Sequence, residues 1–180
     1  MDGREIKNPP MFFLGAAASP FSSNVKFQAL REQKKVNAGA QFFQTNLIFD
    51  IDGMERWLNE LAKRDVLNKV YILAGVTPIK SLKMAKKLAE VPGVYLPTNI
   101  IERMEVADKA GNAQEEGMQI ALEIISKIRM YEKQGIHGIH LMPVGWDEIL
   151  PRIILESGLQ SQDSLFDHIS QEWEHAYQVE

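Results

Sequence analysis

Short apolar segments alternate with longer amphipathic ones along most of this 180-residue chain. Strands are expected at about 12–17, 41–48, 70–74 and 138–142, and apolar residues at helical spacing follow each of them. Nearly continuous apolar strands are typical of a sheet covered on both faces. The alternation predicts one α/β domain over residues 1–180, with a parallel sheet and right-handed crossovers.

Capping residues are expected in front of four helices, and glycines are expected to end three helices. A last amphipathic helix is expected at about 163–177. The capping candidates are Ser22 or Ser23, Asp50 or Asp52, Ser81, and Asn112 with Glu115 as a capping box, and the glycines are Gly39, Gly135 and Gly158.

The conformation of segment 94–97 distinguishes between two possible architectures. If it is a strand, five strands form a doubly wound open sheet. If it only links two helices, the chain holds four β-α units, which is half of a (β/α)8 TIM barrel.

Composition excludes several classes of protein. The net charge of −4 does not favour nucleic acid or an anionic membrane surface, and no apolar run approaches the length of a membrane span. Without cysteine there is no disulfide or thiolate metal site, which suits a reducing compartment, and four scattered histidines indicate no metal centre. The stretch 11–19 faintly resembles a signal peptide, but Asp2 and Glu5 spoil its basic leader, so we interpret it as a buried strand.

In both architectures function belongs at the carboxyl ends of the strands, here 16–20, 44–46, 75–78 and 140–146. Small residues at 16–19 either admit a flat ligand or pack tightly. Asn46 can hydrogen-bond a heterocycle or shape a turn, and His140 is either a ligand contact or a packing residue. Lys35 suits a helix C-terminus on dipole grounds and could equally reach a phosphate.

Taken in order, these segments resemble the methylenetetrahydrofolate reductase family, from about residue 12 to 159, and most closely its acetogen-type bacterial members. The order and spacing of six short motifs carry the resemblance. They are GAAASP at 15–20, KVNAGAQF at 35–42, QTNLIFD at 44–50, AGVTPIKS at 74–81, VYLP at 94–97 and GIHLM at 138–142.

The resemblance implies strands five to eight of a (β/α)8 barrel that holds FAD or FMN. In this family, reduced flavin passes a hydride to methylenetetrahydrofolate, a step of one-carbon metabolism and methionine biosynthesis, and NAD(P)H or another donor recharges the flavin. It further implies a cytoplasmic protein, a homo-oligomer, and a folate substrate.

The resemblance also implies site residues. On the cofactor side, Ala17, Ala18 and Ser19 match the flavin-contacting strand end, and Lys35 matches a cofactor-contacting lysine. Ser23 and Gln28 fall where other members contact the phosphate and ribose, with changed residue types. The substrate side comprises Thr45, Asn46, Met84, Leu88, His140 and Trp146. Asn46 and Met84 each stand where the family usually has a glutamine, and Leu88 stands where it has an aromatic residue. Trp146 lies near a position often held by a basic residue.

No catalytic residue is identified, because the family's acid is a glutamate on strand one and a flavin-side aspartate lies on strand four, and neither strand is expected here. Three hypotheses follow: a reductase half whose N-terminal barrel half is supplied elsewhere, a non-catalytic half-barrel subunit that pairs with itself or a partner, and a folate- or corrinoid-linked methyltransferase component.

Overall fold

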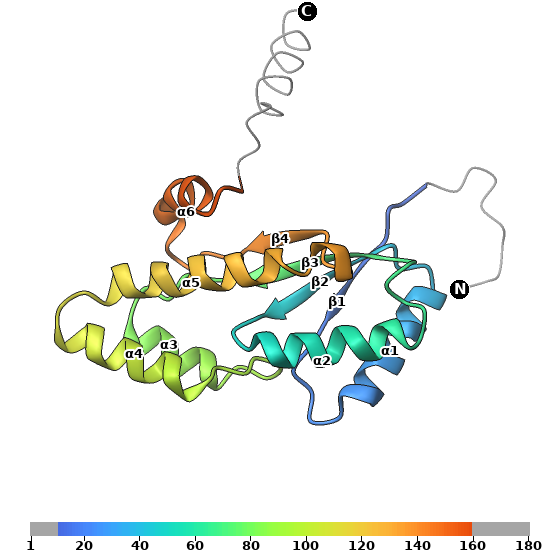
Figure 1. The fold of residues 1–180 in the computed structure, drawn as a ribbon, viewed down its shortest axis with the longest axis horizontal. Coiled ribbons are helices and arrows are strands. Elements are labelled where there is room, and N and C mark those ends of the chain that lie inside the picture. Colours follow the sequence, from blue (N-terminus) through green and yellow to red (C-terminus); the bar gives the residue numbers. More distant parts are fainter. Residues whose placement is uncertain (1–10, 160–180) are drawn as a thin grey trace, which may run out of the picture.

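The computed structural model describes residues 11–159, whose strands form one parallel sheet. β1 (Gly15–Ala18), β2 (Phe42–Leu47), β3 (Tyr71–Val76) and β4 (Gly138–Leu141) lie side by side in chain order (Figure 1). Every neighbouring pair runs parallel. The predicted parallel α/β fold is therefore confirmed, with strand boundaries within three residues of the expected ones.

Helices connect the strands. The helices are α1 (Val25–Asn37), α2 (Ile51–Ala62), α3 (Leu82–Ala89), α4 (Thr98–Lys109), α5 (Ala113–Arg129) and α6 (Leu150–Ser157), with 3-10 turns at Glu132–Gln134 and Asp147–Ile149. The helix expected at 163–177 lies outside the described residues. No described helix is both long and apolar enough to span a membrane.

The segment 94–97 is a link between α3 and α4, and it joins no strand of the described sheet. Pro97 occupies the N-cap position of α4, and Leu96 is buried as a packing side chain. The five-stranded doubly wound alternative is therefore wrong. A doubly wound sheet also reverses its strand order at a switch point, whereas this sheet runs in the sequential order of a barrel.

The predicted cap of α1 is wrong. Asn24 caps α1, since its side chain accepts a hydrogen bond from the Phe27 amide at 3.0 Å. Ser22 instead accepts from the Asn24 amide at 3.4 Å, so neither Ser22 nor Ser23 caps the helix. Asn residues are as good at this position as Ser, and Asn24 stands closer to the first helical turn.

The predicted capping box at α5 is absent. Asn112 occupies the N-cap position without a side-chain bond, and the Glu115 carboxylate instead meets Arg152 of α6 at 2.8 Å. Asp50 likewise precedes α2 without a side-chain cap. Ser81 is confirmed as a cap, because its hydroxyl accepts from the Met84 amide at 3.2 Å.

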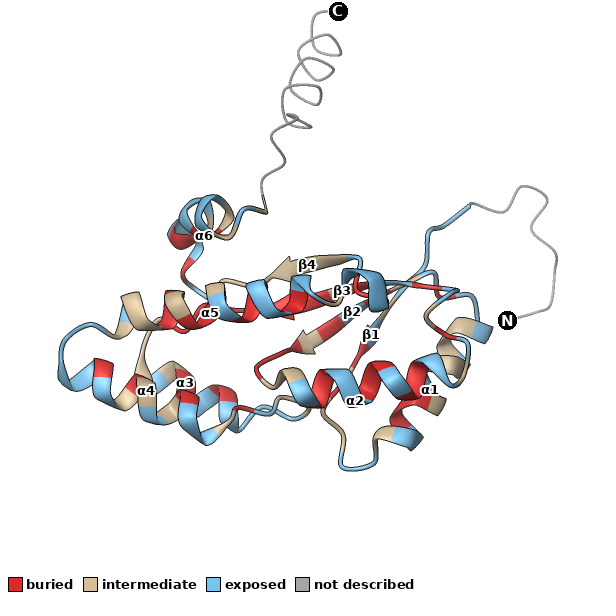
Figure 2. Ribbon diagram, in the orientation of Figure 1, coloured by how far each residue is buried: buried red, intermediate tan, exposed pale blue. Residues whose placement is uncertain are grey.

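The sheet has one covered face and one open face. Phe43, Ile72, Ala74 and Val76 are buried on the helix side, against the apolar faces of helices such as α2 and α5 (Figure 2). Paired residues of parallel strands share a face, so the row Ala17, Gln44, Leu73, Gly138 lies on the other side. In a closed barrel this open face is the interior.

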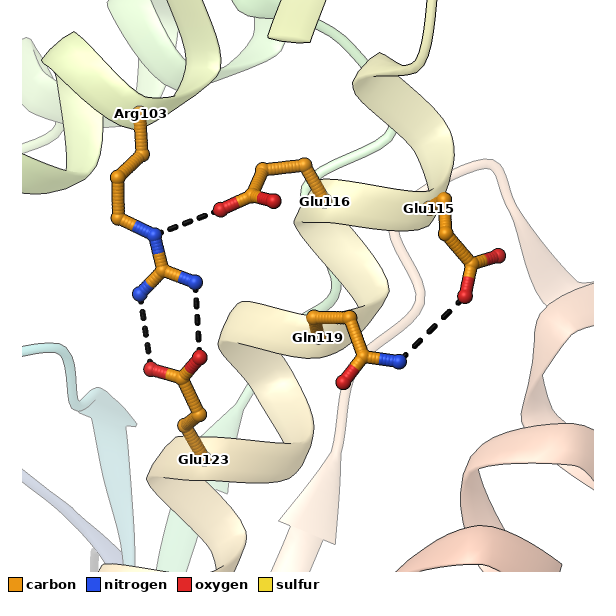
Figure 3. Close-up of polar contacts among 5 residues, drawn as sticks. All are labelled: Arg103, Glu115, Glu116, Gln119 and Glu123. Atoms are coloured by element: carbon orange, nitrogen blue, oxygen red, sulfur yellow. Dashed lines mark hydrogen bonds and ion pairs between the residues drawn. The ribbon is translucent and has the colours of Figure 1, made fainter.

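Arg103 clamps α4 to α5 (Figure 3). Its guanidinium donates through Nε to Glu116 at 2.6 Å and through both terminal nitrogens to Glu123 at 2.8 Å. Beside this clamp Gln119 donates to Glu115 at 3.4 Å within α5. Two-pronged guanidinium–carboxylate pairs fix orientation as well as distance, so Arg103 sets how the α3–α4 pair sits on the rest of the domain.

Candidate functional site

The carboxyl end of β1 is held by a side chain of α1. The Lys35 ammonium donates to the Ala17 carbonyl at 2.5 Å. Ala17 is exposed on the open face, whereas Ala18 is buried on the helix side. Lys35 sits in the last turn of α1, where the helix dipole favours a cation. The predicted cofactor residues Ala17 and Lys35 are thus brought into direct contact.

Ser19 and Asn46 meet just beyond the ends of β1 and β2. The Asn46 side-chain amide donates to the Ser19 hydroxyl at 3.3 Å. The link after α3 closes over this pair, because a Cβ on Gly93 would lie 2.6 Å from the Asn46 amide nitrogen. Gly93 also has a φ of 82°, which favours glycine. The site therefore joins a predicted cofactor residue to a predicted substrate residue.

Thr45 serves the sheet rather than the open face. It is 4% exposed, its hydroxyl accepts from the Gly75 amide at 2.8 Å, and it donates to the Asn46 carbonyl at 2.7 Å. The ladder between β2 and β3 shifts register between Gln44 and Leu47. Thr45 supplies the acceptor that this irregularity removes, so it supports Asn46 from behind.

His140 lies on the open face of β4. It pairs with Gly75 across the sheet, and its Nδ1 is buried with no hydrogen-bond partner among the described residues. Only glycine fits opposite it, because a Cβ on Gly75 would lie 2.6 Å from the Thr45 carbonyl oxygen. A buried ring nitrogen without a partner is costly, so His140 has hydrogen-bonding capacity to offer a ligand.

The other predicted residues are dispersed. Ser23 is exposed, beside a hollow of about 320 Å³ between the β1–α1 loop, the start of α2 and Tyr95. Gln28 is buried and donates to Glu32 at 2.9 Å. Leu88 is buried in the core and Met84 packs against it.

Trp146 is 4% exposed and lies beneath a cation from another element. The Lys80 ammonium stands 5.9 Å from the centre of its ring and 3.4 Å from a Glu148 oxygen. The indole therefore makes a cation–π contact with Lys80, which lies in the loop after β3 and brings a positive charge to this end of β4.

Sequence reasoning missed Glu32, a wholly buried carboxylate on α1. It accepts hydrogen bonds from the Ser19 amide at 3.2 Å, from Gln28 at 2.9 Å and from the Trp57 indole at 2.6 Å. Burial raises the pKa of this carboxyl above its ordinary value, against the lowering effect of those donors and of Lys35. The sequence offered one signal for the burial of Glu32: it lies three residues after Ala29, on the side of α1 that faces the core.

Within residues 11–159 no three histidine, aspartate or glutamate side chains gather closely enough to hold a metal ion. The strand-end groups instead suit an organic ligand. The small exposed Ala17 leaves room for a flat ring at the end of β1, and the carboxamides of Gln44 and Asn46 can meet its polar edge.

The fold defines four consecutive units of a parallel (β/α) barrel, and the strand ends form a candidate site at its carboxyl face. The family model "Methylenetetrahydrofolate reductase" matches residues 15–158, so the chain belongs to that family. The family resemblance inferred from the motifs is confirmed.

Individual relatives are distant and longer. The 5,10-methylenetetrahydrofolate reductase of Escherichia coli (strain K12) is 24% identical over 122 residues, which is 67% of this chain and 40% of that enzyme. Methylenetetrahydrofolate reductase 2 of Schizosaccharomyces pombe is 23% identical over 129 residues, covering 70% of this chain and 20% of the relative. The chain thus spans well under half the length of these curated relatives.

A solved structure has a similar fold. It is that of an uncharacterized protein from Clostridium thermocellum, which binds two copies of 5-methyl-5,6,7,8-tetrahydrofolic acid. It aligns with a TM-score of 0.61 at 20% identity, over 82% of this chain and 53% of that one. The likeness is in the fold, and it confirms the interpretation of the four units as part of a barrel.

Proposed function

We propose that this chain supplies one wall of a flavin- and folate-binding barrel that reduces methylenetetrahydrofolate, as the C-terminal half of a reductase-like flavoprotein. One observation carries the proposal. Hydrogen-bonding groups of Asn46, Gln44 and His140 share the open face with the small exposed residue Ala17, at the strand ends where barrel enzymes bind ligands.

The cofactor side fits FAD or FMN. The exposed Ala17 puts no bulk in front of β1, which suits a planar ring system, and Lys35 brings a cation to the β1 end, where a flavin phosphate would bind. The flavin, when bound, supplies the hydride, and NAD(P)H or another donor reduces it. The protein's own residues bind and orient the two partners.

The substrate side fits a reduced folate. Asn46 offers a donor and an acceptor to a pteridine-like edge, and the buried Nδ1 of His140 gains the partner it lacks among the described residues. Lys80, above Trp146, would exchange its Glu148 partner for the glutamate tail. The Clostridium thermocellum protein of similar fold binds 5-methyltetrahydrofolate, which supports this choice of ligand.

The acid for folate reduction comes from elsewhere in this proposal. No residue on the open face of the described strands is a carboxylate. β1 and β4 each leave one edge without a strand partner in the described sheet. Phe12, Phe13 and Tyr71 stay exposed near the amino ends of the strands. Four further β-α units, in the same polypeptide or in a separate chain, would cover these groups and carry the acid.

The test uses the full 180-residue chain, titrated with FAD, with FMN and with 5-methyltetrahydrofolate, and assayed for reductase turnover. We expect weak flavin binding, folate binding, and no turnover by the chain alone. Robust turnover by the chain alone refutes the half-site proposal. A colourless protein that binds 5-methyltetrahydrofolate and never flavin would favour the methyltransferase component. Stable self-association without either ligand would favour the non-catalytic subunit.

A further inference from the structure

The Glu32 carboxylate joins three elements at the back of the proposed site. One oxygen accepts from the Ser19 amide and from Gln28, and the other accepts from the Trp57 indole. These donors belong to the end of β1, to α1 and to α2. Burying such a network costs free energy unless every polar group in it has a hydrogen-bond partner. A buried carboxylate directly behind Ser19 therefore indicates a role at this position.

The reason lies in the backbone of Ser19. Ala18, opposite Thr45, is the last paired residue of β1, so the Ser19 amide has passed the end of the ladder. Glu32 supplies the missing acceptor at 3.2 Å. On the front of the same residue, the Ser19 hydroxyl accepts from Asn46 at 3.3 Å. Ser19 thus contacts Glu32 through its backbone amide and Asn46 through its hydroxyl.

We propose that Glu32 is a positioning residue for this site: by holding the Ser19 backbone it fixes the Ser19 hydroxyl and, through it, the side-chain amide of Asn46. This inference rests on the proposed folate-binding function. Lys35 assists from the next turn of α1, because it holds the Ala17 carbonyl. The Ser19 amide and the Ala17 carbonyl, on either side of Ala18, are therefore both held by side chains of α1.

A ligand-free measurement tests the coupling. The Ser19 backbone amide and the Asn46 side-chain amide are followed by ¹⁵N–¹H spectra of the full chain as pH is varied. Among the described residues, the charged neighbour that acts on Glu32 is Lys35 on its own helix, since β1 and α2 present an amide and an indole, which do not titrate. We expect both amide signals to titrate with one midpoint above the ordinary glutamate value of 4.5, and Glu32→Gln to abolish that titration.

Trp57→Phe is the matched control. It removes the shortest hydrogen bond to Glu32, at 2.6 Å, and leaves the Ser19 contact in place. The Ser19 and Asn46 signals of this variant should still titrate together. Loss of coupling in Trp57→Phe as well would show that Glu32 only stabilises the junction of α1 and α2, which overturns the proposal.

Ligand binding gives the second readout. Glu32→Leu should weaken 5-methyltetrahydrofolate binding about tenfold, which is equivalent to one hydrogen bond to a charged group, and Trp57→Phe should change it less than about twofold. If Glu32→Leu does not fold, wild-type affinity measured against pH replaces it. That affinity should fall as Glu32 protonates, and Glu32→Gln should flatten the dependence.

The two proposals fail separately. If the wild-type chain binds folate but the Ser19 and Asn46 amides do not titrate together, the positioning role is refuted and the function stands. If the amides titrate together and no folate or flavin binds, the function is refuted and Glu32 positions a site for some other ligand.

Discussion

Gly117 marks the closest backbone approach among the described glycines, and its replacement by alanine gives a sharp test of the packing. α5 crosses the loop after β3 so tightly that a Cβ on Gly117 would lie 1.7 Å from the Ile79 carbonyl oxygen and 2.6 Å from the Ile79 carbonyl carbon. Both are main-chain atoms. To reach even 3.0 Å from 1.7 Å, the helix or the loop must move by 1.3 Å.

Two effects of Gly117→Ala oppose each other. Alanine in a helix interior is favoured over glycine by about 1 kcal/mol. Overpacking typically costs about 1–3 kcal/mol, and the cost is at its upper end where rigid backbone must yield. Steric overlap therefore wins, and we expect a net loss of about 2 kcal/mol. In a chain of this size that lowers Tm by roughly 4–8 °C.

The assay is urea and thermal unfolding followed by far-UV circular dichroism. Gln114→Ala is the control, since Gln114 is an exposed residue of the same helix and its replacement should change the free energy of unfolding by less than about 0.5 kcal/mol. A Gly117→Ala variant as stable as wild type, or more stable, would refute the close approach of α5 to the Thr77–Ile79 loop.

Three further predictions concern the clamp, the buried carboxylate and the site. Arg103→Ala should lower the free energy of unfolding by about 1 kcal/mol, because the pair with Glu123 is partly exposed to solvent, and urea unfolding should show a smaller difference in high salt. The folded state binds the Glu32 proton more tightly than the unfolded chain, so stability should fall as pH rises from 4.5 to the raised pKa and then level off. Urea unfolding over a pH series should show that slope in wild type and not in Glu32→Gln. Asn46→Ala should weaken 5-methyltetrahydrofolate binding about tenfold by calorimetry, whereas Asn68→Ala, on an exposed loop, should leave it unchanged.

Local patterns predicted most of the fold. The apolar strands and the helical spacing depend on neighbours in sequence, so the four strands and their parallel order followed from them. Ser81 was found as a cap because capping involves residues three apart. The same logic misplaced the cap of α1, where Asn24 and Ser22 compete within one turn, and at α5 it missed that Arg152 takes the Glu115 carboxylate.

The sequence nominated individual site residues but not their arrangement. The motifs pointed to Ala17, Lys35 and Asn46. The contact of Asn46 with Ser19, and its cover by Gly93, join segments 27 or more positions apart. Thr45, expected to face the ligand, turned out to bridge a register shift that no local pattern reveals.

The sequence by itself determined the alternation of strands and helices, the parallel sheet and the family, because these are written in periodicity and in short ordered motifs. Only the tertiary structure decided that 94–97 is a link, that Gly117 must be glycine, and that Glu32 stands buried behind Ser19. A side chain's environment depends on what packs against it, and those partners come from distant parts of the chain.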